Sequence, residues 1–165
     1  TKGMDTAVAR LLELLIERRA TVATAESLTG GQLAARLTSV AGASRCYVGG
    51  VVSYATDVKT GVLGVSEDLV SQHGVISAEC ALAMASGVRR LLATTYALST
   101  TGVAGPDPQE GHPPGTVFVG VSAPEGELAF PLLLDGDRAA IQSATCDTAV
   151  ESLLGVLLRE HGGLG

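Results

Sequence analysis

The sequence has no tryptophan and only three tyrosines and two phenylalanines among its 165 residues, and its net charge is −6. Proteins that bind nucleic acid need basic side chains for the phosphates, and single strands are held largely by stacking on aromatic rings. This sequence has no basic stripe and too few rings for either contact. The composition therefore argues against direct binding of nucleic acid.

Cysteine and histidine are also scarce, with three widely separated residues of each: Cys46, Cys80 and Cys146, and His73, His112 and His161. An odd number of distant cysteines does not suit a disulfide framework, so we expect reduced thiols and a cytoplasmic protein. No cysteine or histidine has a second one at the spacing of metal ligands. We expect neither a metal nor a cofactor.

Long hydrophobic runs are absent as well. No apolar stretch reaches the ~18 residues of a membrane span, and no signal-peptide pattern opens the chain, so no membrane partner is expected. With 46% hydrophobic residues, a chain of this length predicts one domain with a three-layer core. We divide it into an N-terminal helix packed on the domain (residues 1–20) and the domain itself (residues 21–165). The sequence leaves open whether the chain stands alone or belongs to a longer protein.

Apolar spacing predicts helices and strands that alternate early in the chain and a hairpin that comes late. The helices are expected over residues 5–19, 29–42, 56–63, 77–92 and 137–160, with a further turn capped by Ser66. The strands are expected over residues 21–25, 46–54, 97–103, 117–121 and 128–134. This order predicts the α/β class, as a three-layer α/β/α sandwich with a mixed, mostly parallel sheet. The twelve-residue Pro/Gly loop 104–115 fits a flap over a pocket.

The stretch TVATAESLTGG (residues 21–31) leads from a strand to Ser27, then to Gly30 and Gly31, and into a helix. A hydroxyl at the carboxyl edge of a sheet, beside backbone amides, suits an attacking oxygen or a bound anion. Lys59 is the obvious partner, because the chain has only two lysines, and the other, Lys2, lies at the start. Lysine can lose its proton in a suitable environment, whereas arginine cannot.

Tyr54 precedes Lys59 by five residues and could relay a proton or hold the geometry. Each of these residues also has a purely structural interpretation. Ser27 could merely cap a helix, Lys59 could be a solvated surface cation, and Tyr54 could be an ordinary strand aromatic. The neighbour Glu26 is expected to face away from Ser27, because successive strand residues point to opposite faces.

Further candidates concern the binding of substrate. Thr29, with the glycine pair that follows it, could bind an anion at the helix start, and the hydroxyl of Thr101 with the open backbone of Gly102 could contact a ligand. Arg138 is a second candidate for an anion, with a surface ion pair to Asp135 as its structural alternative.

At these residues the sequence resembles the CinA C-terminal domain family, whose enzymatic members are nicotinamide-nucleotide amidases. The matching pieces run in order over nearly the whole chain from residue 21: AESLTGG (25–31), Tyr54 with Lys59, TGVAGP (101–106), PGTV (114–117) and GDR (136–138). Three positions depart from the family pattern. Leu28 replaces a cysteine, Thr56 replaces an asparagine, and Gln142 replaces a second basic residue, which implies weaker phosphate binding.

The resemblance implies hydrolysis of the carboxamide of nicotinamide mononucleotide to nicotinate mononucleotide and ammonia. It also implies an α/β/α fold, no metal, and a homodimer or larger oligomer, with Ser27, Tyr54 and Lys59 as the catalytic cluster. The mechanism from the residues agrees: Ser27 attacks while neutral Lys59 takes its proton, and amides of the turn at residues 29–31 hold the oxyanion. The alternative is a non-catalytic module that binds a nucleotide or a protein partner, as the family's link to competence and DNA damage suggests.

Overall fold

The computed structural model describes residues 2–163, which form six α-helices, one 3₁₀ helix and five strands. In chain order the elements are α1 (Lys2–Glu17), β1 (Val22–Glu26), α2 (Gln32–Thr38), η1 (Ala43–Arg45), β2 (Tyr47–Val52), α3 (Thr56–Gly61), α4 (Glu67–His73), α5 (Ala78–Leu92), β3 (Tyr96–Gly102), β4 (Thr116–Ala123), β5 (Gly126–Leu133) and α6 (Arg138–Gly163). Within this part of the chain, no helix is long and apolar enough to cross a membrane.

The strands form one mixed sheet in the order β2-β1-β3-β4-β5. β1 pairs in parallel with both β2 and β3, whereas β3 with β4 and β4 with β5 pair antiparallel. Four strands therefore point the same way and β4 alone runs against them. The predicted mixed sheet is confirmed, although its pairings divide evenly between parallel and antiparallel.

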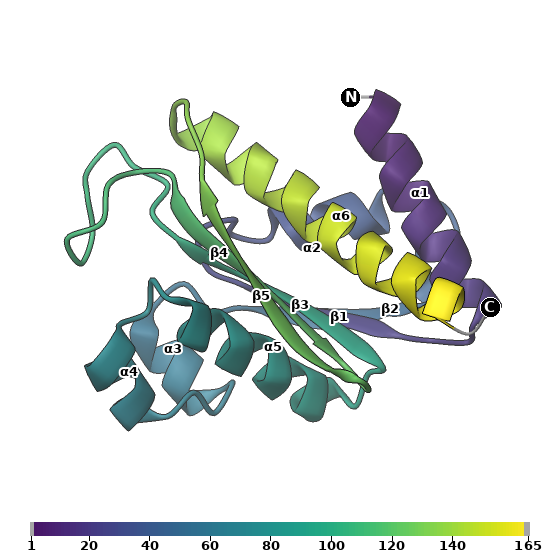
Figure 1. Ribbon diagram of the computed structural model, residues 1–165, viewed down its shortest axis with the longest axis horizontal. Helices are drawn as coiled ribbons and strands as arrows, with labels where there is room; N and C mark the ends of the chain where they lie inside the picture. The colour runs from purple at the N-terminus through teal and green to yellow at the C-terminus, as the bar shows by residue number, and fades with distance from the viewer. Residues whose placement is uncertain (1, 164–165) are drawn as a thin grey trace.

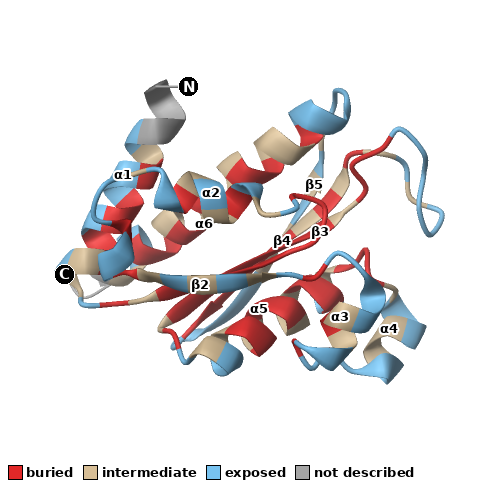
Figure 2. Ribbon diagram, turned by 180° about the vertical axis from the view of Figure 1, so that it is seen from behind, coloured by how far each residue is buried: buried red, intermediate tan, exposed pale blue. Residues whose placement is uncertain are grey.

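Helices cover both faces of the sheet, which confirms the predicted three-layer sandwich (Figure 1). One layer holds α1, α2 and α6, and the other holds α3, α4 and α5. Each layer buries its own apolar cluster against the sheet, around Leu11, Leu15 and Leu153 on one face and around Met84 and Val88 on the other. Figure 2 shows the buried sides of the helices turned inward and their exposed sides outward.

The predicted elements are all present, and their boundaries differ at local features of the backbone. The second helix begins at Gln32 instead of Thr29, because Gly30 and Gly31 adopt left-handed φ values of +55° and +103° and extend the turn. Ser66 caps α4 as predicted, and Ser77 caps α5. Each serine accepts a hydrogen bond from a backbone amide three residues on.

The topology determines where a site can form. The parallel strands β1, β2 and β3 end at the same edge of the sheet. β1 leads into α2 on one face, whereas the chain after β2 crosses to α3, α4 and α5 on the other. In open α/β sheets, ligands bind in the crevice outside the carboxyl ends of the strands where such connections diverge.

Candidate active site

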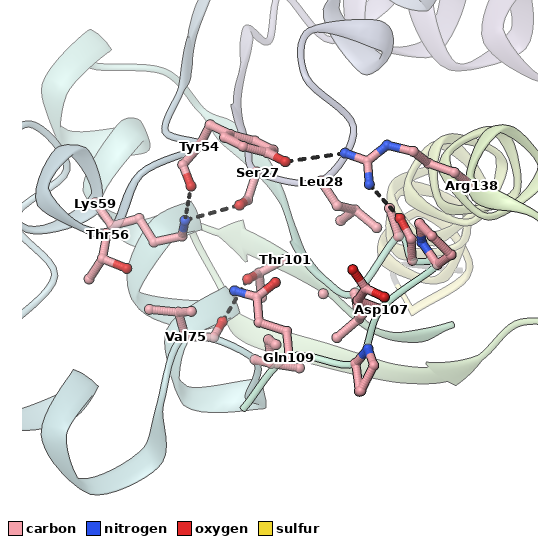
Figure 3. Close-up of a pocket in the computed structure, with 17 residues that line it drawn as sticks. Ser27, Leu28, Tyr54, Thr56, Lys59, Val75, Thr101, Asp107, Gln109 and Arg138 are labelled. Carbon is pink, nitrogen blue, oxygen red and sulfur yellow. Dashed lines mark hydrogen bonds between the residues drawn. The ribbon is translucent and has the colours of Figure 1, made fainter. Parts of the chain in front are cut away.

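A cavity of about 400 Å³ lies at this edge of the sheet. Its lining comes from the segments that follow β1 and β2, the turn before α5, the end of β3 with the loop after it, and the start of α6 (Figure 3). Six of the residues predicted for the site line it: Ser27, Tyr54, Lys59, Thr101, Gly102 and Arg138.

The centre of the cavity is a direct contact between Ser27 and Lys59. The Lys59 Nζ lies 3.0 Å from the Ser27 Oγ, and it donates to the backbone carbonyls of Ser53 at 2.7 Å and Tyr54 at 3.3 Å. Ser27 is itself fixed, because its amide donates to the backbone oxygen of Thr100 at 3.0 Å. The sequence predicted this pair, and the structure brings it within hydrogen-bond distance.

The surroundings of Lys59 favour its neutral form. The side chain is only 1% exposed, and burial lowers the pKa of its amine from the ordinary value of 10.5, against smaller opposing effects of Cys80 and Glu110. In the described part of the chain no carboxylate pairs with it. A neutral amine has two N–H groups for the two carbonyls and one lone pair for the Ser27 proton. The arrangement therefore suits a general base.

Tyr54 takes a different place from the one a proton relay needs. Its hydroxyl accepts a hydrogen bond from Arg138 Nη2 at 3.2 Å, and the residue is 62% exposed. Only its backbone carbonyl contacts Lys59. The Arg138 guanidinium also donates to the Gly105 carbonyl at 2.6 Å, and no ion pair with Asp135 forms among the described residues. Tyr54 and Arg138 together form the outer wall of the cavity (Figure 3).

The glycine turn at residues 29–31 lies outside the cavity, although the sequence predicts that it binds substrate there. Thr29, Gly30 and Gly31 are outside its lining, and the amides at the start of α2 are already bonded to the buried carboxylate of Glu26. Glu26 accepts from the amides of Gly31, Leu33 and Ala34 at 2.9–3.2 Å and from the Thr29 hydroxyl at 2.6 Å. The Glu26 carboxylate thus occupies the place at the start of α2 where the sequence suggested a ligand anion. As expected from strand alternation, it points away from Ser27.

We expect Glu26→Gln to lower the free energy of unfolding by ~2–4 kcal/mol. The change places an amide NH₂ group against backbone N–H donors and removes charge-assisted hydrogen bonds in a buried position. Thermal denaturation should show a clear decrease in Tm. Glu13→Gln, on the exposed side of α1, is the matched control and should stay within ~0.5 kcal/mol of wild type. Equal melting of both variants would contradict the capping role.

The amide of Leu28 is the better candidate for stabilising an oxyanion. Leu28 lines the cavity directly after Ser27, and its N–H makes no hydrogen bond within the described residues. The peptide that carries this N–H is oriented, because the Ser27 carbonyl accepts from the Gly30 amide at 3.1 Å. On the next peptide, Gln142 donates to the Leu28 carbonyl at 2.9 Å. Gln142 thus holds the turn beside Ser27.

The remaining predicted residues support the walls of the cavity. The Thr101 hydroxyl donates to the Val75 carbonyl at 2.6 Å, so it ties the end of β3 to the turn before α5. Gly102 lies in close contact with β4, where an added Cβ would come within 2.5 Å of the Thr116 carbonyl. Among the described residues, no group of three or more His, Cys, Asp or Glu is arranged to hold a metal ion.

Comparisons with known proteins agree with one another. Residues 4–157 match the family described as the CinA C-terminal domain. A CinA-like protein of Frankia casuarinae is 50% identical over 154 residues, which cover 93% of this chain and 35% of that protein. The chain thus spans about a third of the length of this curated relative.

Solved structures show the same fold. A competence-damaged protein (CinA) superfamily protein from Klebsiella pneumoniae superposes with a TM-score of 0.91 at 30% identity, over 94% of this chain and 98% of that one. A competence/damage inducible protein from Agrobacterium tumefaciens gives a TM-score of 0.88 at 33% identity, over 92% and 94% of the two chains.

Proposed function

Because the chain belongs to the CinA C-terminal domain family, we propose that it hydrolyses the carboxamide of nicotinamide mononucleotide, yielding nicotinate mononucleotide and ammonia. The observation that carries the proposal is the 3.0 Å contact between the Ser27 hydroxyl and a buried lysine amine without a carboxylate partner in the described chain. A lysine that served only as a surface cation would lie in solvent. This one is oriented by two carbonyls toward a hydroxyl in a cavity.

The proposed reaction proceeds through an ester on Ser27. The Ser27 Oγ attacks the carboxamide carbon while the Lys59 amine accepts its proton, and the oxyanion that forms is bound by the Leu28 amide. As the C–N bond breaks, Lys59 returns the proton to the leaving nitrogen and ammonia departs. Water then attacks the ester while Lys59 takes its proton, and as the bond to Ser27 breaks, Lys59 passes that proton to the Ser27 Oγ and the nicotinate product leaves.

The direct test is release of ammonia from nicotinamide mononucleotide by the purified protein, with nicotinate mononucleotide identified as the second product. Turnover supports the proposal. Binding of the mononucleotide without turnover would instead assign the chain to the non-catalytic alternative.

Arg138 is the proposed phosphate contact, since the α2 amides are already bonded to Glu26 and the Arg138 guanidinium lines the cavity mouth. We expect Arg138→Met to lower kcat/KM for nicotinamide mononucleotide roughly 10- to 100-fold more than kcat/KM for nicotinamide riboside, which lacks the phosphate. The ratio between the two substrates cancels any shared effect of losing the bond to Gly105. An equal loss for both substrates would limit Arg138 to supporting the loop.

A further inference from the structure

The loop between β3 and β4 contains a small hairpin at residues 109–112. Gln109 and His112 exchange backbone hydrogen bonds of 3.0 and 2.8 Å, and Glu110 and Gly111 between them have φ values of +50° and +78°. Two positive φ values in a row are typical of a type I′ turn, which favours Asn or Gly at the first position. A positive φ is unfavourable for glutamate, so contacts of the Glu110 side chain must offset the strain of its backbone.

The Glu110 carboxylate reaches across to the turn between α4 and α5. It accepts hydrogen bonds from the amide of Val75 at 3.1 and 3.2 Å and from the amide of Ile76 at 3.1 Å. The turn is shaped for it, because Gly74 has a φ of +74° and an added Cβ would lie only 2.6 Å from Glu110 Oε1. Consecutive backbone amides of this kind form a concave site for an anion, and here the anion belongs to the same chain.

One partner of this contact lies in the cavity wall, and the other directly follows a segment that does. Val75 and Ile76 line the cavity, and so does the loop segment 106–109 directly before Glu110. The other end of that segment is held at Gly105 by Arg138. Residues 106–109 therefore lie between two side-chain anchors, one at each end, and Figure 3 shows Asp107 and Gln109 of this segment beside the cavity.

We propose that Glu110 is a positioning residue for the amidase reaction: its carboxylate, bonded to the Val75 and Ile76 amides, holds residues 106–109 as a wall around the bound substrate. The inference rests on the proposed function for its kinetic effect. The Ser27–Lys59 contact does not depend on the loop, since carbonyls of Ser53 and Tyr54 hold the amine. Loss of the anchor should therefore weaken substrate binding. Burial lowers the pKa of Lys59 whereas Glu110 acts to raise it, so removal of Glu110 favours the neutral amine further, and the chemical step should stay nearly intact.

The kinetic test compares Glu110→Ala with Glu110→Gln. We expect the alanine variant to raise KM for nicotinamide mononucleotide at least tenfold with kcat within about threefold of wild type. The glutamine variant keeps an oxygen that accepts from the two amides and should recover most of the affinity. Glu125→Ala, in the exposed turn between β4 and β5, is the control and should match wild type. A Glu110→Ala enzyme with unchanged KM, or with kcat reduced instead, would overturn the proposal.

A double-mutant cycle tests whether the anchor acts through the α4–α5 turn. Gly74→Ala should raise KM in the same direction, because its Cβ displaces the Glu110 carboxylate. In the Glu110→Ala background the same change should raise KM by a smaller factor than in wild type, because only the strain of an alanine at a φ of +74° remains. Full additivity of the two effects would contradict the contact as their common cause.

Hydrogen exchange gives a readout that does not need the enzyme to be active. In the full chain, the Val75 and Ile76 amides should exchange at least tenfold faster in Glu110→Ala than in wild type, while core amides of β1 keep their protection. Unchanged exchange at both residues would overturn the anchor even if the protein is an amidase. Faster exchange in a protein that does not release ammonia would support the anchor and reject only the proposed function.

Discussion

Replacing Lys59 by arginine should slow release of ammonia from nicotinamide mononucleotide by ~10²–10⁴-fold, the usual contribution of a general base. Arginine stays protonated at every working pH, so it has no lone pair to accept the Ser27 proton. A lysine that only supplied positive charge would tolerate the change. The measurement is kcat of the purified variant in a coupled ammonia assay.

Lys59→Met is the companion variant, because arginine adds volume at a position that is 1% exposed. Methionine keeps the approximate length of the side chain without an amine, and it should lose as much activity as arginine does. Melting curves separate this loss from unfolding. If either variant keeps more than a tenth of wild-type turnover, Lys59 is not the proton acceptor.

The pH dependence of the wild-type rate provides a second readout of Lys59. Burial lowers the pKa of its amine, so turnover should rise with pH through an ionisation below 10.5 and then level off. The pKa of Lys59 is lower in the folded state than in the unfolded state, so the unfolded state binds the proton more tightly. The free energy of unfolding should therefore decrease as pH falls from the unfolded-state pKa to the folded-state pKa. Activity that decreases over this rise in pH would contradict a neutral base.

The Ser27–Lys59 pair could be predicted from the sequence because two local signals agreed. A strand that ends in a serine and a glycine pair places a hydroxyl at the sheet edge. A single internal lysine, in a chain whose other internal cations are arginines, indicates a role that needs a removable proton. The parallel pairing of β1 with β2 then brings the segments after the two strands together.

The sequence leaves two candidates for the phosphate site, the helix start at residues 29–31 and Arg138, and the contacts of Glu26 argue against the first. The helix start at residues 29–31 resembles an open anion site in the sequence, but the chain supplies its own carboxylate from the end of β1. Strand alternation correctly predicted that the side chains of Glu26 and Ser27 point to opposite faces of the sheet. It could not show that the side chain turns back to cap α2. The absence of a capping side chain at Gly31 is the signal that could have found it.

Tyr54 and Glu110 mark the limit of sequence reasoning. With five residues between them in sequence, Lys59 could contact either the hydroxyl or the backbone carbonyl of Tyr54. In the folded chain the carbonyl contacts Lys59, and the hydroxyl contacts Arg138. Glu110 contacts amides 34 and 35 residues earlier in the chain, and nothing in a Pro/Gly loop specifies so distant a partner. Contacts of this kind depend on tertiary structure.

Ser27→Ala should abolish hydrolysis, with a loss of at least ~10³-fold, and leave the fold and much of the substrate affinity intact. The fold should survive because the Ser27 hydroxyl bonds only to Lys59 among the described residues, whereas its amide keeps the contact with Thr100. We expect a change in unfolding free energy within ~1 kcal/mol. Ser39→Ala, at an exposed position after α2, is the control and should keep full activity.

The same variant distinguishes an acyl-enzyme from direct attack by water. If Ser27 is the nucleophile, wild-type protein quenched during turnover should carry an acyl adduct on the peptide that contains Ser27, and Ser27→Ala should carry none. If Lys59 instead activated water directly, the alanine variant would keep the base and a cavity with added room for water, so substantial turnover would remain. A Ser27→Ala enzyme with near-normal turnover and no adduct on the wild-type peptide would therefore reject the ester intermediate while leaving Lys59 as the base.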